Sequence, residues 1–366
     1  MTRSTASANI SPIETAHATS TKSRAKSLLR RAALSTLLCA GMMAAPLQAT
    51  HAAELVKRTF CVFDIIGKSG PIYNAMQEYR LAAMGWGVDL ELKPFTDERI
   101  TVEEFKSGQC DAVGVTGLRG RTFNAFTGTI DSIGAIPDYD TLRVVLQKLA
   151  SPQLAPLMKS GEYEVVGIGP AGAVYLMVND RSIKTVSDLS GKRIAVLDFD
   201  KSQGVMVESI GASPVTATIA TFGSMFNNGA VDVIAAPAVA FGPLELHKGV
   251  GSKGAIVDFA MVQLTVQVLT RHDRFPEGFG QKSREYILAQ FDKTMAEIGK
   301  ATQNIDSKMW MKIPEKDIPG YTEMARQTRL RLRDEGFYDP KMLKFLSRVR
   351  CELKPGLSEC TAPDRE

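Results

Sequence analysis

Residues 60–93 read FCVFDIIGKSGPIYNAMQEYRLAAMGWGVDLELK, and their pattern predicts the fold. We expect a buried strand over 62–66, a loop over 67–71 and an amphipathic helix over 72–84. The strict alternation of apolar and polar residues over 88–93 predicts a second strand with one solvated face. A strand followed by a helix, repeated along the chain, is typical of α/β folds with a mostly parallel sheet.

The same alternation continues beyond residue 93 and falls into two consecutive units. The further strands that we expect are 111–115, 164–168, 174–178, 193–197, 213–216, 231–234 and 261–270, and from residue 283 onward nearly all is helix. Beyond the N-terminal region the chain has roughly 300 residues, more than one hydrophobic core usually serves. We therefore predict two lobes, the first from 54–170 with helices of 270–366, the second from 171–269. The expected ligand site is a cleft at the carboxyl ends of the strands.

The N-terminal residues 1–53 have the features of a disordered extension followed by a secretory signal. Basic residues over 22–31 precede an apolar stretch, 32–47, that ends in small residues. That stretch is interrupted and falls short of the roughly 20 apolar residues of a membrane-spanning helix. We expect cleavage within 49–53, export to the periplasm and a mature chain that does not span the membrane, with a retained anchor as the alternative.

The charge balance argues against nucleic acid as a partner. The chain has 44 Lys and Arg against 40 Asp and Glu, a net charge of +4. Much of this excess lies in the leader, so the mature surface carries no polybasic face for a phosphate backbone. The apolar fraction of 44% and the charged fraction of 23% are those of an ordinary globular protein.

Four of the five cysteines lie beyond the leader, and an even number in an oxidising compartment favours two disulfides. Cys61 and Cys110 could bridge if their strands are neighbours. Cys351 and Cys360 could close the C-terminal tail into a loop. The alternative for Cys61 and Cys110 is a pair of free thiols buried in the core.

The segment Gly167–Gly172, GIGPAG, matches the dinucleotide-binding fingerprint G-x-G-x-x-G after a predicted strand. That fingerprint requires a helix that begins at its second glycine, Gly169, so that backbone N–H groups face the pyrophosphate. The residues that follow are β-branched and aromatic, and no acidic residue stands at the expected spacing. We therefore interpret the segment as a glycine-rich hinge or cleft loop, with a nucleotide site as the alternative.

No catalytic arrangement or cofactor site is evident in the sequence. His247 and His272 are the histidines beyond the leader, and neither has a partner at metal-ligand spacing. Neither a G-x-S-x-G nucleophile elbow nor a phosphate-binding P-loop is present. We predict no enzyme activity, no metal and no cofactor.

Polar side chains follow the strand predicted at 111–115. Thr116, Arg119 and Arg121 bring a hydroxyl and two guanidinium groups to a strand's carboxyl end, where they could hold an anionic group. The alternative is that both arginines are ordinary surface charges.

Two further clusters stand at loops where strands end. Asp198 and Asp200 follow the strand over 193–197 and could meet a cation or hydroxyls, although a solvated loop or a helix cap explains them equally well. Lys68 and Ser69 precede the first helix and could supply an ammonium group or N–H donors, with a plain turn as the alternative.

Residues 182–196, SIKTVSDLSGKRIAV, resemble a segment of the DctP-like receptors of TRAP transporters, I-K-T-x-x-D-L-x-G-K-K-I-R-V. Further on, GASPV at 211–215 is similar to that family's G-A-x-P-V. The family's usual carboxylate-binding Arg is replaced by Ala195, and the Asn before Pro237 is replaced by Ala236. Organic-acid specificity therefore does not carry over, and the chain resembles a divergent subgroup, some members of which are associated with efflux.

The resemblance implies a two-lobed α/β fold of the Venus-flytrap type, with mixed or parallel sheets and a helical C-terminal region. It implies a periplasmic receptor that captures a small molecule between its lobes and delivers it to membrane permease subunits. We add Gly169, Tyr175 and Pro237 to the predicted ligand site. The alternatives are a periplasmic flavin- or nicotinamide-dependent oxidoreductase that uses Gly167–Gly172, and an accessory protein of an envelope or efflux complex.

Overall fold

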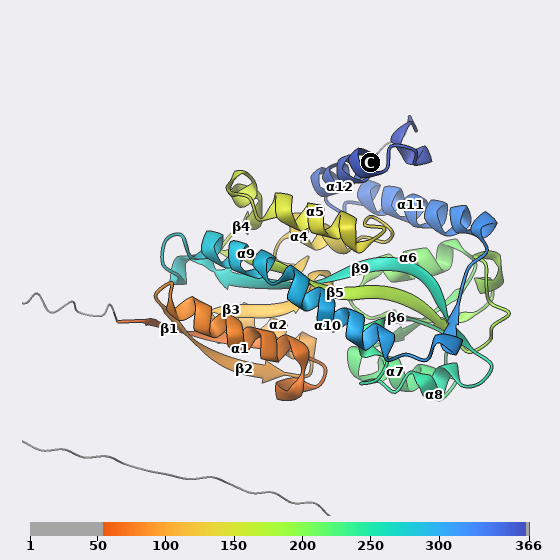
Figure 1. The fold of residues 1–366 in the computed structure, drawn as a ribbon, viewed down its shortest axis with the longest axis horizontal. Coiled ribbons are helices and arrows are strands. Elements are labelled where there is room, and N and C mark those ends of the chain that lie inside the picture. The colour runs from red at the N-terminus through yellow and green to blue at the C-terminus, as the bar shows by residue number, and fades with distance from the viewer. Residues whose placement is uncertain (1–53, 364–365) are drawn as a thin grey trace, which may run out of the picture. The chain divides into compact units, whose positions relative to one another are not determined.

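The computed structural model describes residues 54–363 and 366 and has a mixed α/β architecture. The predicted signal and its cleavage site lie outside these residues. One mixed sheet has the strand order β2-β1-β3-β9-β5-β8-β6-β7, with β10 beside β9 and β4 beside β5. Figure 1 shows helices on both faces of this sheet. Within the described part of the chain, no helix is long and apolar enough to cross a membrane.

The strands are β1 (Val56–Phe63), β2 (Val88–Phe95), β3 (Ala112–Thr116), β4 (Lys159–Ser160), β5 (Tyr163–Val178), β6 (Arg193–Leu197), β7 (Ser213–Ala217), β8 (Val233–Pro237), β9 (Ala255–Arg271) and β10 (Trp310–Met311). The outer triplets β2-β1-β3 and β8-β6-β7 are each parallel. Between them β9 runs antiparallel to β3 and to β5, and β5 runs antiparallel to β8. The prediction of a mostly parallel sheet therefore holds for the triplets but not for the centre.

The two central strands are long, 16 residues in β5 and 17 in β9, and they pair along nearly their whole length. β3 pairs with β9 at 266–270, whereas β8 pairs with β5 at 174–178, near the opposite end of the ladder. The sheet thus has a first half, the triplet β1–β3, and a second half, the triplet β6–β8. Both halves are joined through β5 and β9.

The prediction of a loop at Gly167–Gly172 is wrong, because this segment lies inside β5, whereas its role as a hinge stays a prediction. Register shifts between Val165 and Gly167 and between Pro170 and Gly172 absorb the irregular residues. A Cβ atom at Gly167 would lie 1.9 Å from Cδ1 of Ile287, so the glycine permits close packing of a helix on the strand. No helix begins at Gly169, and the nucleotide-binding alternative lacks its structural basis.

The helices are α1 (Pro71–Met84), α2 (Glu98–Lys106), α3 (Gly117–Gly120), α4 (Ala125–Gly128), α5 (Tyr139–Leu149), α6 (Lys201–Ser209), α7 (Ile219–Asn227), α8 (His247–Val250), α9 (Phe279–Ala289), α10 (Phe291–Gln303), α11 (Ile318–Asp334) and α12 (Pro340–Leu353). Several begin at a side chain that accepts from a backbone N–H, as at Asp97, Asp138 and Asp339. α9 and α10 pack on β5, as Figure 1 shows.

Apolar clusters fill both faces of the sheet in the first half. Alternate residues of β1 divide between them: Cys61 and Phe63 face the cluster that includes α5 and α12, and Phe60 and Val62 face the cluster with α1. In the second half, Tyr321 of α11 joins the core around β6 and β8. The C-terminal helices therefore contact both halves.

Both cysteine pairs are joined by disulfides in the structure. Cys61 of β1 and Cys110, which precedes β3, have Cα atoms 5.9 Å apart, and those of Cys351 and Cys360 are 5.6 Å apart. β1 and β3 are neighbours, as the first bridge requires. The alternative of free core thiols at Cys61 and Cys110 is wrong.

Candidate functional site

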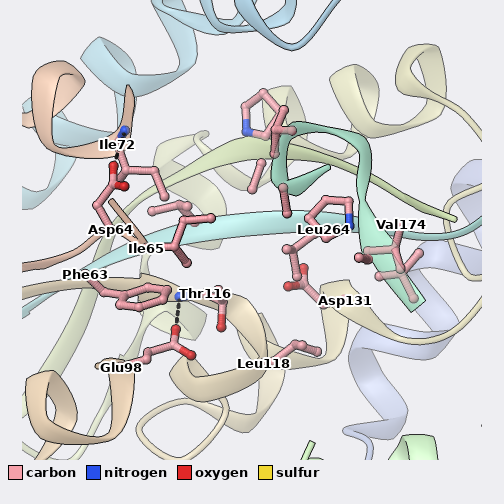
Figure 2. Close-up of a pocket in the computed structure, with 18 of the residues that line it drawn as sticks. Phe63, Asp64, Ile65, Ile72, Glu98, Thr116, Leu118, Asp131, Val174 and Leu264 are labelled. Atoms are coloured by element: carbon pink, nitrogen blue, oxygen red, sulfur yellow. Dashed lines mark hydrogen bonds between the residues drawn. The ribbon is translucent and has the colours of Figure 1, made fainter. Parts of the chain in front are cut away.

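A cavity of about 420 Å³ is lined by both halves of the sheet. Its lining comes from β1, α1 and α2 of the first half, from β6, α6, α7 and β8 of the second, and from the shared elements β5, β9, α9 and α10. This is the concave, inter-unit location typical of small-molecule sites. Figure 2 shows side chains from several of these elements converging on it.

Most of the lining is apolar. β9 contributes Leu264 and Val266, β5 contributes Val174, and α9 and α10 contribute Ile287 and Ile298. These residues come from alternating strand positions and from helix faces that pack on the sheet, so the cavity is an extension of the hydrophobic core. An occupant would therefore meet hydrocarbon over most of its surface.

One wall of the cavity is formed where β1 leads into α1. The buried Asp64 accepts the backbone N–H groups of Ile66, at 3.0 Å, and of Ile72 and Tyr73, at 2.9 and 3.1 Å. A Cβ at Gly70 would lie 1.8 Å from Asp64 Oδ1, so only glycine leaves room for this cap. The N-terminal donors of α1 are thus taken by a carboxylate of the chain itself.

A second polar cluster lies at the carboxyl end of β3. Glu98 Oε1 accepts the N–H of Thr116 at 2.7 Å, as Figure 2 shows, and its Oε2 lies 3.8 Å from Arg119 Nε. The Arg119 guanidinium stacks on the Phe199 ring, 3.4 Å from its centroid, and its Nη2 is 4.0 Å from Asp198. Burial raises the pKa of Glu98, against the opposing effects of the Thr116 hydrogen bonds and the Arg119 charge.

The third cluster centres on Asp200, which caps α6. Its Oδ1 accepts the hydroxyl of Ser202 at 2.7 Å and lies 3.5 Å from Arg121 Nη1. Arg121 also donates to the carbonyl of Gly128 at 3.0 Å and lies over the ring of Phe337, 4.5 Å from its centroid. The two arginines of the first half therefore both reach aspartates of the second half.

Asp131 is a buried carboxyl on the cavity wall that the sequence did not indicate. Its Oδ1 accepts the hydroxyl of Thr265 at 2.7 Å, and its Oδ2 accepts the N–H of Thr265 at 3.2 Å. Burial raises the pKa of Asp131 to about 7, although the Thr265 hydrogen bonds and the Arg121 charge oppose the shift. The carboxyl therefore changes protonation near neutral pH.

Of the residues predicted to bind ligand, the structure places four in the cavity wall: Thr116, Gly169, Asp200 and Pro237. The others lie outside the lining, namely Lys68, Ser69, Arg119, Arg121, Tyr175 and Asp198. Lys68 and Ser69 are exposed on a 3-10 turn, and Tyr175 packs edge-on against Trp310, with ring centroids 5.0 Å apart. Arg119 and Arg121 lie behind the wall, engaged by carboxylates.

Several lining residues were missed, among them Glu98, Asp131 and the apolar residues of β9, α9 and α10. Glu98 follows the helix cap Asp97, which offers a local signal for a helix start but none for a site. Of the two replaced family positions, Ala236 lines the cavity and Ala195 does not. Within residues 54–363, no group of His, Cys, Asp and Glu is arranged to hold a metal ion.

With this geometry in place, the comparisons with known proteins assign the family. The sequence profile of the family described as solute-binding protein AdeT 1/2 matches residues 80–365. The chain belongs to the AdeT family of solute-binding proteins. It is 43% identical over 303 residues to the probable solute-binding protein AdeT1 of Acinetobacter baumannii, covering 83% of this chain and 100% of that relative. The family is one of binding proteins and not of enzymes.

Solved structures of TRAP periplasmic solute-binding proteins share the fold. One from Desulfovibrio salexigens, with bound orotic acid, has a TM-score of 0.68 at 15% identity and covers 81% of this chain and 99% of its own. Another, from Shewanella oneidensis with bound succinate, has a TM-score of 0.65 at 13% identity and covers 81% and 99%. The resemblance to the DctP-like receptors that the sequence suggested is thereby confirmed at the level of the fold.

Proposed function

We propose that this AdeT-family protein is a periplasmic receptor that captures a small molecule in the cavity and delivers it to a membrane permease. The observation that carries the proposal is the cavity itself, about 420 Å³ in volume, with walls from both halves of one sheet. Two disulfides fit an oxidising compartment. The family membership supplies the binding role but neither the solute nor the permease.

We further propose that the halves act as the two lobes of 54–170 with 270–366 and of 171–269, closing on the solute. Arg119 and Arg121 of the first lobe lie 4.0 Å from Asp198 and 3.5 Å from Asp200 of the second. Charged pairs of this kind between the lobes would form as the lobes approach each other. A solute that touches both lobes would bind the closed state better than the open one and so shift the population toward it.

Native mass spectrometry of protein purified gently from the periplasm tests the proposal. We expect a co-purified small molecule at one copy per chain, and a smaller radius of gyration with solute than without it. A Gly169→Leu variant should weaken or lose binding of the molecule, because a Cβ at Gly169 finds room at 3.6 Å from Ile287 and the longer side chain then takes up part of the cavity. Gly204→Leu, on α6 with open space where an added Cβ would lie, is the matched control.

The proposal fails if no solute co-purifies and a screen of acids, amino acids, sugars, polyamines and apolar compounds changes neither the melting temperature nor the scattering. That result would instead favour an accessory role in an envelope complex.

A further inference from the structure

Resting on the proposed function, we infer that the solute is a predominantly apolar organic molecule that carries no negative charge. The cavity is rich in hydrocarbon, and the acidic side chains that line it have no basic counterpart among the described lining residues. Among the described residues that line it there is no Lys, Arg or His, whereas five carboxyl groups are present: Asp64, Glu98, Asp131, Asp200 and Glu297. A bound anion would find no cation among these lining residues to balance its charge.

The nearest cations are already engaged. Arg119 is stacked on Phe199 and lies 3.8 Å from Glu98, and it contributes no atom to the cavity wall. Arg121 donates twice to the carbonyl of Gly128 and lies 3.5 Å from Asp200. Drawing either guanidinium into the cavity would leave a buried carboxylate without its counter-charge, which is costly in a buried site.

The other common anion site in such folds is a helix N-terminus, and here it is closed. α1 begins at the cavity wall, with Pro71 and Ile72 among the lining residues. Its first free N–H groups donate to Asp64, whose side chain occupies the place that a solute carboxylate or phosphate would take. The N-terminus of α1 therefore presents a satisfied cap to the solute.

Glu98, on this wall, has a buried side-chain oxygen that lacks a hydrogen-bond partner. Its Oε2 lies 3.8 Å from Arg119 Nε, and its Oε1 is the atom that Figure 2 shows bonded to Thr116. A hydroxyl, amine or amide N–H of the solute would satisfy Oε2. Hydrophobic contact would come from Val174, Leu264, Val266 and Ile287.

The fold by itself does not dictate this preference, since solved proteins of the same fold hold orotic acid and succinate. The preference for a solute without negative charge comes from the lining side chains of this protein, which among the described residues include no Lys, Arg or His.

Two fluorescent probes with the same aromatic skeleton test the inference on the purified protein: uncharged N-phenylnaphthylamine and its sulfonated analogue, anilinonaphthalenesulfonate. We expect saturable fluorescence enhancement with one N-phenylnaphthylamine per chain. The sulfonated probe should bind at least about tenfold more weakly, because its charge must be buried without a partner. Gly169→Leu should abolish the high-affinity enhancement, which places the probe in the cavity.

An Ala171→Arg variant supplies the missing cation, because Ala171 is half-buried on the cavity wall. It should reverse the order of the two affinities, and Ala171→Met, of similar length without the charge, should not. Equal or tighter binding of the sulfonated probe to the unmodified protein would overturn the inference. So would N-phenylnaphthylamine binding that Gly169→Leu leaves intact.

The co-purified solute separates this inference from the proposed function. If that solute is an organic acid, the receptor role stands and the inference about its chemistry falls. If no solute, probe or screened compound binds, both fall together.

Discussion

Replacing Asp131 by Asn should change how the stability of the protein depends on pH. The folded-state pKa of about 7 lies above the ordinary value of 3.8, because burial disfavours the carboxylate more strongly than Thr265 and Arg121 favour it. The native state therefore holds a proton over the range from about pH 4 to 7 that the unfolded chain has released. The stability that this proton contributes is fully present below the unfolded pKa and is lost as pH rises through the folded pKa.

The size of the effect follows from the two pKa values. Raising the pKa from 3.8 to about 7 corresponds to roughly 4 kcal/mol of unfolding free energy when the pH is well above 7. Most of it, roughly 2–3 kcal/mol, is lost between pH 5 and pH 8. Asn reproduces the protonated carboxyl, because its oxygen can accept the N–H of Thr265 and its amide can donate to the Thr265 hydroxyl.

Urea unfolding of both proteins at pH 5 and pH 8, with the disulfides intact, measures the difference. The unfolding free energy of Asp131→Asn minus that of the unmodified protein should rise by roughly 2–3 kcal/mol from the lower pH to the higher. Asp188→Asn is the control. Backbone N–H groups of Lys184 and Thr185 lower the pKa of this exposed aspartate, so its protonation does not change between pH 5 and pH 8 and the corresponding difference should stay constant. If the difference in unfolding free energy between Asp131→Asn and the unmodified protein is the same at both pH values, burial does not raise the pKa of Asp131.

Two further substitutions test a close contact at the cavity wall and a buried ion pair near the C-terminus. Gly70→Ala should lose about 2–4 kcal/mol of unfolding free energy in urea, because its Cβ would overlap Asp64. Gly204→Ala, in open space on α6, is the control and should be neutral or stabilising. Glu359→Gln should cost about 3 kcal/mol, because it weakens the hydrogen bonds to the buried Arg350. Pairing with Arg350 lowers the pKa of Glu359, although burial opposes the shift. The unmodified protein should therefore lose its extra unfolding free energy over Glu359→Gln as pH falls through that lowered pKa. A difference between the two proteins that stays constant in acid would contradict the pairing.

Periodicity predicted the elements whose character is local. The alternation over 88–93 and the amphipathic pattern over 72–84 correspond to β2 and α1 with small changes at the ends. The continuity of β5 was missed because Pro170 and its neighbouring glycines are typical of a loop. Pairing with the long strand β9 overrides that local preference, and bulges accommodate the residues that do not fit a regular ladder.

The strand-end rule located part of the cavity wall. Thr116 and Asp200 do line the cavity, as the rule for carboxyl ends of strands predicts. Arg119 was expected to be available to an anion, but Glu98, which lies in a different element, engages it. Asp131 and the apolar wall depend on how distant elements pack, and no local pattern in the sequence encodes that packing.

The continuity of β5 and β9 limits how the protein can move. Where lobes are joined by loose linkers, each can rotate as a rigid body about a free hinge. Here a hydrogen-bonded ladder runs from one triplet to the other, so separation of the halves must bend and twist that ladder, with the strain concentrated at its bulges near Pro170 and Tyr175. For the lobe closure proposed above, the elasticity of two strands, more than the length of a connecting loop, would set how far the halves can separate.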